Sequence, residues 1–408
     1  MNRVVITGIG AVTPIGNDVP TFWENAVAGK CGIDFITRFD TSDMKVTIAG
    51  EVKDFDPSLS MEKAEIRKTD LYAQYAMAAA VEAMKDSGLE GKVSPERLGV
   101  YVGSGIGGMT TFMQEHEKLL EKGSKRISPF FIPMMISNIA AGNIAIRFHA
   151  EGPSMDISTA CATSSNTVGE AFRAIKFGYA DAMIAGGAEA TLNPLAIGGF
   201  TNCQALSTTN DPKNASIPFD KRRDGFVIGE GGGILILEEY EHAKKRGAKI
   251  YAEICGYGNT NDAYHMTAPH PDAVGPTNAV KLAVQEAGIP ADAKLYINAH
   301  GTSTPLNDKT ETKAFKNALG KQAREALISS TKSMTGHMLG ATGAVEAIVC
   351  ALVLKNGIVP PTIGYKEPDP ECDLDYVPNT ARKADVEYAL STNLGFGGHN
   401  ACLAFKKV

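Results

Sequence analysis

Short apolar runs bounded by glycine alternate with longer helical stretches along this chain, and this alternation limits the possible folds more than any other feature. Such alternation predicts a layered α/β architecture, in which helices cover the faces of a sheet. With 408 residues the chain is long enough for two or three domains. The predicted strands are Val4–Thr7, Leu98–Val102, Ala182–Ala185, Gly233–Leu237, Tyr251–Cys255, Leu295–Asn298, Ala326–Ser329 and Ala401–Phe405.

Two of the expected helices are rich in small residues, which predicts close packing between other elements. Leu71–Ser87 stops before Gly88, and Met338–Lys355 ends before Gly357. A glycine just after the last turn is a common helix end. Two further segments are predicted to be irregular and to form a site or an interface, as long loops often do. They are Asn193–Phe226 and Val359–Asn379.

A short segment near the start of the chain is weakly repeated after its midpoint. Val4–Gly10 and Ala252–Gly258 both read as a strand that ends in Gly-x-Gly. A repeated pattern of this kind fits a duplicated α/β unit. We therefore expect two similar halves, residues 1–250 and 251–408, although so short a match could arise by chance.

Charge, hydropathy and cysteine usage narrow the class of protein. There are 40 lysine and arginine residues against 46 aspartate and glutamate residues, a net charge of −6 that gives no case for nucleic acid. No apolar run is expected to reach the ~18 residues of a membrane span. The N-terminus lacks signal-peptide features. Seven cysteines without a CxxC pair indicate free thiols in a reducing compartment. These features predict a cytoplasmic protein that binds neither nucleic acid nor membrane.

Three glycine-rich segments look like ligand loops at first sight. Gly103–Gly108 satisfies GxGxxG, but the helical stretch Met109–Lys122 follows where a dinucleotide-binding unit needs a second strand. A structural glycine turn is the better interpretation. Gly229–Gly233 and Gly395–Gly398 lack the lysine of a phosphate-binding loop.

Cys161 lies where a strand-like segment, Ser154–Ser158, turns into a helical stretch, Ala162–Phe177. Backbone N–H groups and the positive end of a helix dipole favour a thiolate at such a position. The sequence therefore predicts that the pKa of this thiol lies below its usual value of ~8.5. The alternative is a buried core cysteine, and we keep that interpretation for the other six.

Two histidines follow predicted strands. His300 comes after Leu295–Ala299, and His337 precedes a helix rich in alanine and glycine, with Lys332 five residues before it. Positions at strand ends raise both above the usual structural role of a lone histidine. A zinc site from Cys161 and the two histidines is the alternative, but no pair of ligands at i+3 or i+4 spacing supports it.

Four segments together resemble one known family. They are, in chain order, Asp156–Ser164, Asn298–Thr304, Lys332–His337 and Gly395–Asn400. With them the chain resembles the β-ketoacyl-[acyl-carrier-protein] synthases over essentially its whole length, and it is most similar to the elongating, synthase II type of bacteria. The resemblance implies a thiolase fold, with two similar α/β halves in five αβαβα layers, and a homodimer. Leu394 stands where many members have phenylalanine; this departure affects the expected lining of the acyl pocket, so the resemblance does not imply a chain-length preference.

The resemblance also implies an activity and a set of site residues. The family joins acyl and malonyl groups carried by acyl carrier protein, through an acyl-enzyme on the cysteine. The phosphopantetheine arrives on the carrier protein, and neither a cofactor nor a metal is expected. The implied catalytic residues are Cys161, His300, His337 and Lys332, with Lys332 orienting His337 and tuning the local field. The implied donors to the oxyanion are the backbone N–H groups of Cys161 and Phe396. The resemblance also implies that Thr302 and Thr304 bind pantetheine, and that the acyl pocket or its gate consists of Ile106, Phe200 and Phe396.

The implied carrier-protein docking surface consists of two basic clusters, which would attract an acidic partner. They comprise Lys63, Arg67 and Lys68, and then Lys125 and Arg126. Such clusters are otherwise simply solvated. Two alternative functions remain. A thiolase or initiating synthase that uses acyl-CoA would need a second catalytic cysteine or an asparagine, and a nonenzymatic chain-length subunit would lack the cysteine.

Overall fold

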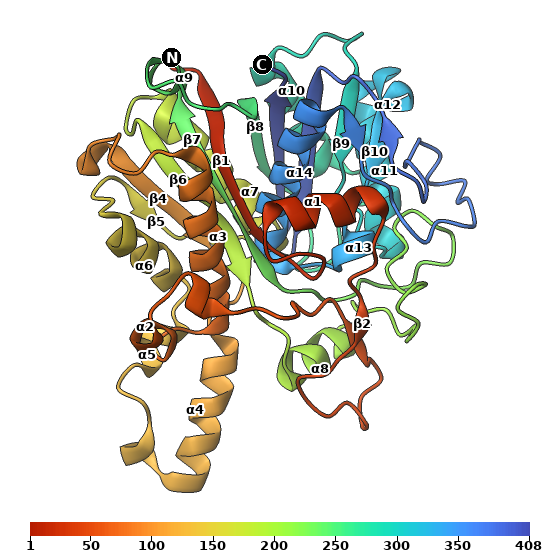
Figure 1. The fold of residues 1–408 in the computed structure, drawn as a ribbon. Coiled ribbons are helices and arrows are strands. Elements are labelled where there is room, and N and C mark those ends of the chain that lie inside the picture. Colours follow the sequence, from red (N-terminus) through yellow and green to blue (C-terminus); the bar gives the residue numbers. More distant parts are fainter.

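Ten strands form the central sheet of the protein, whose computed structural model describes all 408 residues (Figure 1). Their bounds are β1 Val4–Val12, β4 Leu98–Gly103, β5 Ser154–Met155, β6 Ala182–Glu189, β7 Gly231–Glu239, β8 Ala252–Asn261, β9 Leu295–Asn298, β10 Leu327–Ser329, β13 Tyr388–Gly395 and β14 His399–Lys406. Two small ribbons pair β2 Asp34–Phe35 with β3 Ile48–Ala49, and β11 Ile358–Val359 with β12 Arg382–Lys383.

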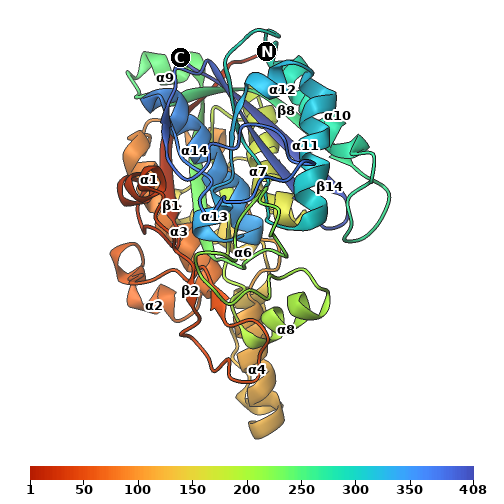
Figure 2. The same ribbon diagram turned by 90° about the vertical axis from the view of Figure 1, so that its right-hand side faces the viewer.

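The helices form three layers, one between the two halves of the sheet and one on the outer face of each half (Figures 1 and 2). Their bounds are α1 Val19–Ala28, α2 Lys63–Ile66, α3 Leu71–Ser87, α4 Met109–Lys122, α5 Phe131–Met135, α6 Ile139–Phe148, α7 Thr163–Lys176, α8 Pro194–Asn202, α9 Tyr240–Lys245, α10 Val274–Ala287, α11 Pro305–Leu319, α12 Gln322–Glu325, α13 Lys332–Thr335 and α14 Thr342–Asn356. Helices α7 and α14 lie in the largest hydrophobic core, between the two halves of the sheet. A second core joins α3 and α6 to one half, and a third joins α10 and α11 to the other. The predicted αβαβα arrangement is confirmed.

The order of the strands repeats from the centre of the sheet outwards. The full order is β10-β9-β13-β14-β8-β1-β7-β6-β4-β5, so β1 and β8 lie side by side in the middle. They pair antiparallel through three residues of each strand, from Val4 opposite Ile254 to Ile6 opposite Ala252. Each half then has two antiparallel pairings, β1–β7–β6 in one and β8–β14–β13 in the other, and its outer strands pair in parallel. This arrangement supports two related halves, and the division at residue 250 stays a prediction.

The Gly-x-Gly echo has the same physical cause in both halves, because each glycine pair lets a helix backbone approach the strand. A Cβ atom at Gly10 would lie 2.0 Å from the carbonyl oxygen of Ala79 in α3. A Cβ atom at Gly258 would lie 1.9 Å from the carbonyl oxygen of Ala279 in α10. No side chain fits at such distances, so the pattern in the sequence records how closely each outer helix packs on the sheet.

We expect Gly258→Ala to lower the free energy of unfolding by about 1–3 kcal/mol or more, because the new methyl group must push α10 away from β8. Urea denaturation followed by circular dichroism measures this loss. Gly142→Ala in α6 is the matched control, since its new Cβ atom would approach nothing closer than 3.9 Å. Equal denaturation midpoints for the Gly258 variant and the unmodified protein would contradict the close packing.

All eight predicted strands are present, but three local predictions were wrong. Strand β13, Tyr388–Gly395, was missed because polar residues fill its second half, although Asn393 and its neighbours are buried. Residues 194–202, predicted to be irregular, form α8, where the side chain of Asn193 caps the N–H of Ala196. The strand predicted at Ser154–Ser158 is only Ser154–Met155.

The glycine predictions hold where the structure tests them. Helix α3 ends at Gly88 with φ +57°, and α14 ends at Gly357 with φ +65°, both in the left-handed region that favours glycine. The GxGxxG segment connects β4 to α4, which projects away from the sheet rather than packing on it (Figure 1). This geometry agrees with a structural glycine turn and not with a dinucleotide site.

One helical stretch is long and apolar enough to cross a membrane by length and composition. It comprises Leu339–Asn356, with a mean hydropathy of 1.4, and 89% of it is buried inside the protein. The expectation that no apolar run reaches such a length was therefore wrong. The stretch includes α14, which is apolar because it packs against both halves of the sheet.

Candidate active site

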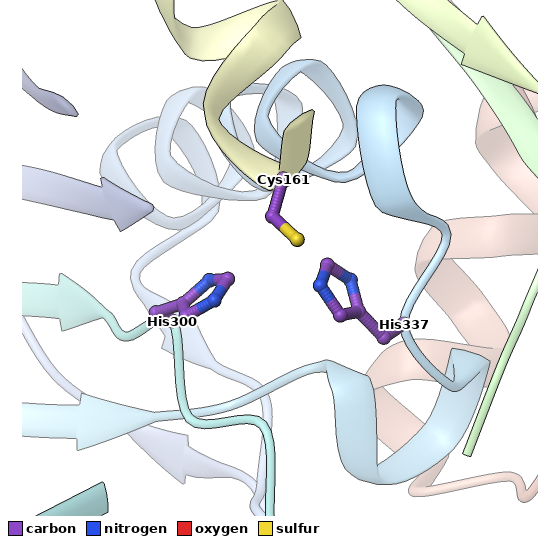
Figure 3. A group of neighbouring side chains, drawn as sticks. All are labelled: Cys161, His300 and His337. Atoms are coloured by element: carbon purple, nitrogen blue, oxygen red, sulfur yellow. The ribbon is translucent and has the colours of Figure 1, made fainter. Parts of the chain in front are cut away.

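Cys161, His300 and His337 meet at one end of the central helices (Figure 3). Cys161 lies in a short 3-10 turn, Ala160–Ala162, directly before α7, while His300 follows β9 and His337 follows α13. The sulfur and one nitrogen of each imidazole all lie within 4.8 Å of one another. The two rings are nearly perpendicular, with centroids 5.3 Å apart. Three residues that are distant in the sequence thus form one cluster around the thiol.

The turn that carries Cys161 is tight and closely packed. Ala160 has φ +52°, a left-handed conformation that non-glycine residues seldom adopt outside functional turns. Gly395 packs against this turn, since a Cβ atom there would lie 2.5 Å from the carbonyl oxygen of Thr159 and 3.2 Å from the Cys161 nitrogen. The following residue, Phe396, directs its backbone N–H at the Cys161 sulfur. Two backbone N–H groups, those of Cys161 and Phe396, are therefore close together.

The predicted preference for the thiolate is wrong for this structure. Burial raises the pKa of the Cys161 thiol to about 11. The positive charge of Lys332 and the hydrogen bond from the Phe396 N–H act in the opposite direction but do not outweigh the loss of solvent. The cysteine is therefore a neutral thiol, which needs a base to become a nucleophile.

Both histidines are suited to exchanging protons or donating hydrogen bonds. Burial, followed by the nearby charge of Lys332, lowers their pKa values well below the usual range, so both rings are neutral at pH 7. The Nδ1 atom of His337 lies 3.1 Å from the Thr342 hydroxyl, while its Nε2 atom is buried without a partner. That free nitrogen is available to a bound substrate.

A buried carboxylate holds the loop of His300. The backbone N–H groups of His300 and Gly301 donate to the two oxygens of Glu311 at 2.7 and 2.8 Å. The Thr392 hydroxyl donates to the same carboxylate at 2.7 Å. Burial raises the pKa of Glu311 to about 7. The loop is thereby tied to α11 on one side and to β13 on the other.

Lys332 has a different partner from the one expected. Its side chain is 1% exposed, and its Nζ atom lies 2.5 Å from an oxygen of Glu346, which is equally buried. Asn393 donates to the other Glu346 oxygen at 2.8 Å, and the same nitrogen lies 3.4 Å from His300 Nδ1. Lys332 thus connects through two residues to His300, whereas Thr342 contacts His337. The expectation that Lys332 orients His337 is not supported by a contact, but its charge does lower the pKa values of the thiol and of both imidazoles.

A cavity of about 610 Å³ opens over the three reactive side chains. The hydroxyls of Thr302 and Thr304, 2.9 Å apart, belong to its wall. A second, apolar cavity of about 410 Å³ lies beside it, and Ile106 lines both. Leu394 also lines the first cavity, which agrees with its expected contact with an acyl chain. The residues predicted to bind substrate all line the first cavity: Ile106, Phe200, Thr302, Thr304 and Phe396.

The basic residues predicted to dock a carrier protein are all exposed, and none lines the cavity. Lys63 begins α2, and Arg67 and Lys68 follow it directly. Lys125 and Arg126 lie in a 3-10 turn after α4. The Lys68 ammonium lies 4.9 Å from the centre of the Phe130 ring, which follows Arg126 by four residues in the chain.

Several residues at the site were missed by sequence reasoning. Glu346 had a detectable signal, because it is the only charged residue in the apolar run 343–354. Glu311 and Asn393 gave no such signal, since each lies in an ordinary polar stretch. Phe226 packs edge-on against the His337 ring, with centroids 5.2 Å apart, and lies in a loop that sequence alone does not place.

Comparison with known families decides between the possible uses of this cluster. The model described as "Beta-ketoacyl synthase, N-terminal domain" matches residues 1–243, and "Beta-ketoacyl synthase, C-terminal domain" matches residues 251–366. The chain belongs to the β-ketoacyl synthase family. The predicted family resemblance is thereby confirmed.

Two named relatives are similar to almost the whole chain. A Staphylococcus aureus (strain COL) protein named 3-oxoacyl-[acyl-carrier-protein] synthase 2 is 54% identical over 406 residues, which cover 99% of this chain and 98% of the relative. A Synechocystis protein of the same name is 51% identical over 407 residues, with 99% and 98% coverage. At these identities this β-ketoacyl synthase is a condensing enzyme of the acyltransferase type.

Solved structures of ketosynthases share the fold. A β-ketoacyl synthase from Burkholderia phymatum is 36% identical with a TM-score of 0.92, over 100% of both chains. A type II polyketide ketosynthase, solved bound to a hexaketide and in complex with its acyl-carrier protein, is 37% identical with a TM-score of 0.90, again over 100% of both chains. The predicted thiolase-type fold is confirmed by these neighbours.

Proposed function

We propose that this β-ketoacyl synthase condenses an acyl-carrier-protein thioester with malonyl-carrier protein and releases 3-oxoacyl-carrier protein, free carrier protein and CO₂. The observation that carries the proposal is a buried thiol, Cys161, between two neutral imidazoles at the wall of a 610 Å³ cavity. The relatives named 3-oxoacyl-[acyl-carrier-protein] synthase 2 support the elongating reaction.

In the first step, the Cys161 sulfur attacks the thioester carbonyl of the acyl substrate. A neutral imidazole accepts the thiol proton, which is needed because burial raises the pKa of the thiol to about 11. The N–H groups of Cys161 and Phe396 stabilise the tetrahedral oxyanion, an interaction that can be worth ~3–4 kcal/mol per donor. The pantetheine thiol leaves with the proton, and the acyl group stays on Cys161.

In the second step, a malonyl thioester enters the same cavity. His300 and His337 donate hydrogen bonds to its thioester oxygen, and loss of CO₂ leaves an enolate that these two donors stabilise. The enolate carbon attacks the acyl-enzyme carbonyl, and the Cys161 sulfur departs as a thiolate, which takes up a proton from water to restore the neutral thiol. The unpartnered Nε2 atom of His337 supports this role.

The remaining site residues receive supporting roles. Lys332 acts through its charge, paired with Glu346, on the thiol and both imidazoles. Thr302 and Thr304 hold the pantetheine arm, while Ile106, Phe200 and Phe396 line the acyl pocket. We propose that the enzyme has no cofactor of its own and uses no metal ion, because the thiol and the imidazoles suffice for both steps.

We further propose a cytoplasmic homodimer that binds carrier protein but neither nucleic acid nor membrane. The dimer is supported by exposed apolar side chains on α4, α5 and β5, the strand at one edge of the large sheet. They are Phe112, Leu119, Leu120, Ile132 and Met155. The two predicted halves, residues 1–250 and 251–408, form one subunit of this dimer.

A panel of acyl substrates tests the proposed function. Acyl-carrier proteins from C4 to C16, saturated and unsaturated, should acylate Cys161 and yield 3-oxoacyl products when malonyl-carrier protein is added. Mass spectrometry detects both species. Faster reaction with acyl-CoA substrates, or product formation without an acyl group on Cys161, would instead favour the thiolase or initiating-synthase alternative.

Reversing the charge of Lys125 and Arg126 together should raise the KM for carrier-bound substrates about 3- to 30-fold, because each exposed ion pair is worth ~0–1 kcal/mol. The loss should shrink as salt increases. Reaction with a small acyl thioester that lacks the carrier should stay unchanged.

The matched control for this experiment is charge reversal of Lys244 and Lys245. These exposed neighbours lie on α9, at the opposite end of the molecule from α4 (Figure 1). Equal losses in the two double variants, or equal damage with the small thioester, would contradict a docking role for the first pair.

A further inference from the structure

Glu189, at the end of β6, is a buried carboxylate that the reaction above does not use. Its side chain is 0% exposed, and it accepts five hydrogen bonds, all from neutral groups. The donors are the hydroxyls of Ser104 at 2.9 Å and Thr191 at 3.0 Å, and the backbone N–H groups of Gly105 at 2.9 Å, Ile106 at 3.3 Å and Gly340 at 3.0 Å. Like Glu346, it is the lone charged residue of its stretch of sequence, residues 182–210.

Four of the five donors come from two segments that are far apart in the chain, and the fifth, Thr191, lies two residues after Glu189. One segment, Ser104–Ile106, follows β4, and the other, Leu339–Ala341, follows the loop of His337. Their backbones are in direct contact, because a Cβ atom at Gly340 would lie 2.4 Å from the Gly105 nitrogen. The same oxygen of Glu189 accepts from both of these N–H groups. The carboxylate therefore joins the two segments at their point of contact.

Both segments form walls of the catalytic cavity, and one of them also borders the second cavity. Gly105, Ile106 and Leu339 line the catalytic cavity. Ile106 lines the apolar cavity as well, together with Met109 and Phe112. A long acyl chain on Cys161 that extends from one cavity into the other must pass the Ile106 side chain. The position of Ile106 thus decides how much chain the site accepts.

We propose that Glu189 is a positioning residue for acyl-chain selection, which holds Ile106 between the two cavities. This inference rests on the proposed acyl-enzyme at Cys161. The carboxylate of Glu189 can hold Ile106 in place because it accepts all five hydrogen bonds, whereas the amide of a glutamine cannot. If the NH₂ group of a glutamine replaced the oxygen that faces Gly105 and Gly340, two N–H groups would lose their acceptor. If the NH₂ group replaced the other oxygen, the N–H of Ile106 would lose its acceptor.

Glu189→Gln is therefore expected to loosen Ile106 and to favour long chains. We expect the ratio of Cys161 acylation rates with C12- and C4-acyl carrier protein to rise about two- to tenfold, the range that corresponds to one net hydrogen bond. Decarboxylation of malonyl-carrier protein should change less than twofold, since malonyl thioesters react at the histidines and do not pass Ile106. Stopped reactions analysed by mass spectrometry give both acylation rates.

Glu51→Gln is the matched control. Glu51 is also buried, at 3% exposure, and accepts only from neutral groups, the N–H and hydroxyl of Thr37 and the N–H of Arg38. It lines neither cavity, so its variant should lose stability without any change in the C12/C4 ratio. Equal changes of the ratio in both variants would overturn the proposal, because they would reflect loss of stability alone.

A double-mutant cycle with Ile106→Ala tests whether Glu189 acts through Ile106. The effect of Glu189→Gln on the ratio should disappear once the Ile106 side chain is removed, and a persistent effect would overturn the proposal. If Glu189→Gln does not fold, Ser104→Ala replaces it, with the same direction expected. The unmodified enzyme separates the two hypotheses: failure to acylate Cys161 would overturn the proposed function, whereas normal acylation with an unchanged variant ratio would overturn only the role of Glu189.

Discussion

Replacing Cys161 with alanine should abolish condensation while malonyl-carrier protein is still decarboxylated. Without the sulfur no acyl-enzyme can form, so formation of 3-oxoacyl product should fall by at least about 1,000-fold, as expected when a covalent nucleophile is removed. Decarboxylation requires only the two imidazoles, His300 and His337, whose hydrogen bonds stabilise the enolate. The variant should therefore release CO₂ and produce no 3-oxoacyl thioester.

The experiment compares CO₂ release with product formation under identical conditions. Cys203→Ala is the matched control, because Cys203 is the other cysteine that borders the cavity but lies on its exposed side. That variant should keep both activities. Loss of both activities in Cys161→Ala, with the fold intact, would contradict the division of labour between the thiol and the histidines.

His300→Ala and His337→Ala should each slow decarboxylation about 100- to 1,000-fold, the usual cost of removing one donor to a developing oxyanion. Acylation of Cys161 should persist at a reduced rate in both variants. Each leaves one neutral imidazole beside the thiol to accept its proton, and the backbone N–H groups of Cys161 and Phe396 are unchanged.

Single-turnover acylation, followed by mass spectrometry, separates the two steps. His116→Ala, an exposed position on α4 away from the cavity, is the control and should leave both rates unchanged. If neither active-site variant could be acylated at all, the histidines would be essential for the first step, and the assigned roles would be wrong.

Much of the fold was predictable because the relevant patterns are local. Strands such as Leu295–Asn298 were placed to the residue, since an apolar run with polar or glycine neighbours identifies a buried strand on its own. The helix Leu71–Ser87 was equally exact, because the glycine after it supplies a left-handed C-cap. Strand β13 was missed for the converse reason, because its buried polar residues carry no local signal when distant parts of the chain satisfy them. Helix α8 was missed because Gly198 and Gly199 lower its helix propensity, although Pro194 and the cap at Asn193 are local signals.

The residues of the site could be predicted from the sequence, but the pKa of the thiol could not. Cys161 lies directly before α7 and His300 just after β9, positions that the sequence indicates directly, whereas His337 lies between α13 and the turn that leads into α14. The pKa of the thiol depends instead on how completely the folded protein excludes water, and burial raises it to about 11. A helix start read from sequence predicted the opposite direction, since burial is a property of the whole assembly of elements.

The sequence by itself determined the alternation of strands and helices, the Gly-x-Gly contacts of both halves and the three reactive residues, because each follows from neighbours along the chain. Only the tertiary structure decided which partners the buried charges have. Lys332 pairs with Glu346 rather than contacting His337, and Glu189 joins Gly105, 84 residues before it, to Gly340, 151 residues after it. Such pairings form because a buried charge must find donors or a counter-charge wherever folding brings them, and no spacing in the sequence specifies that place.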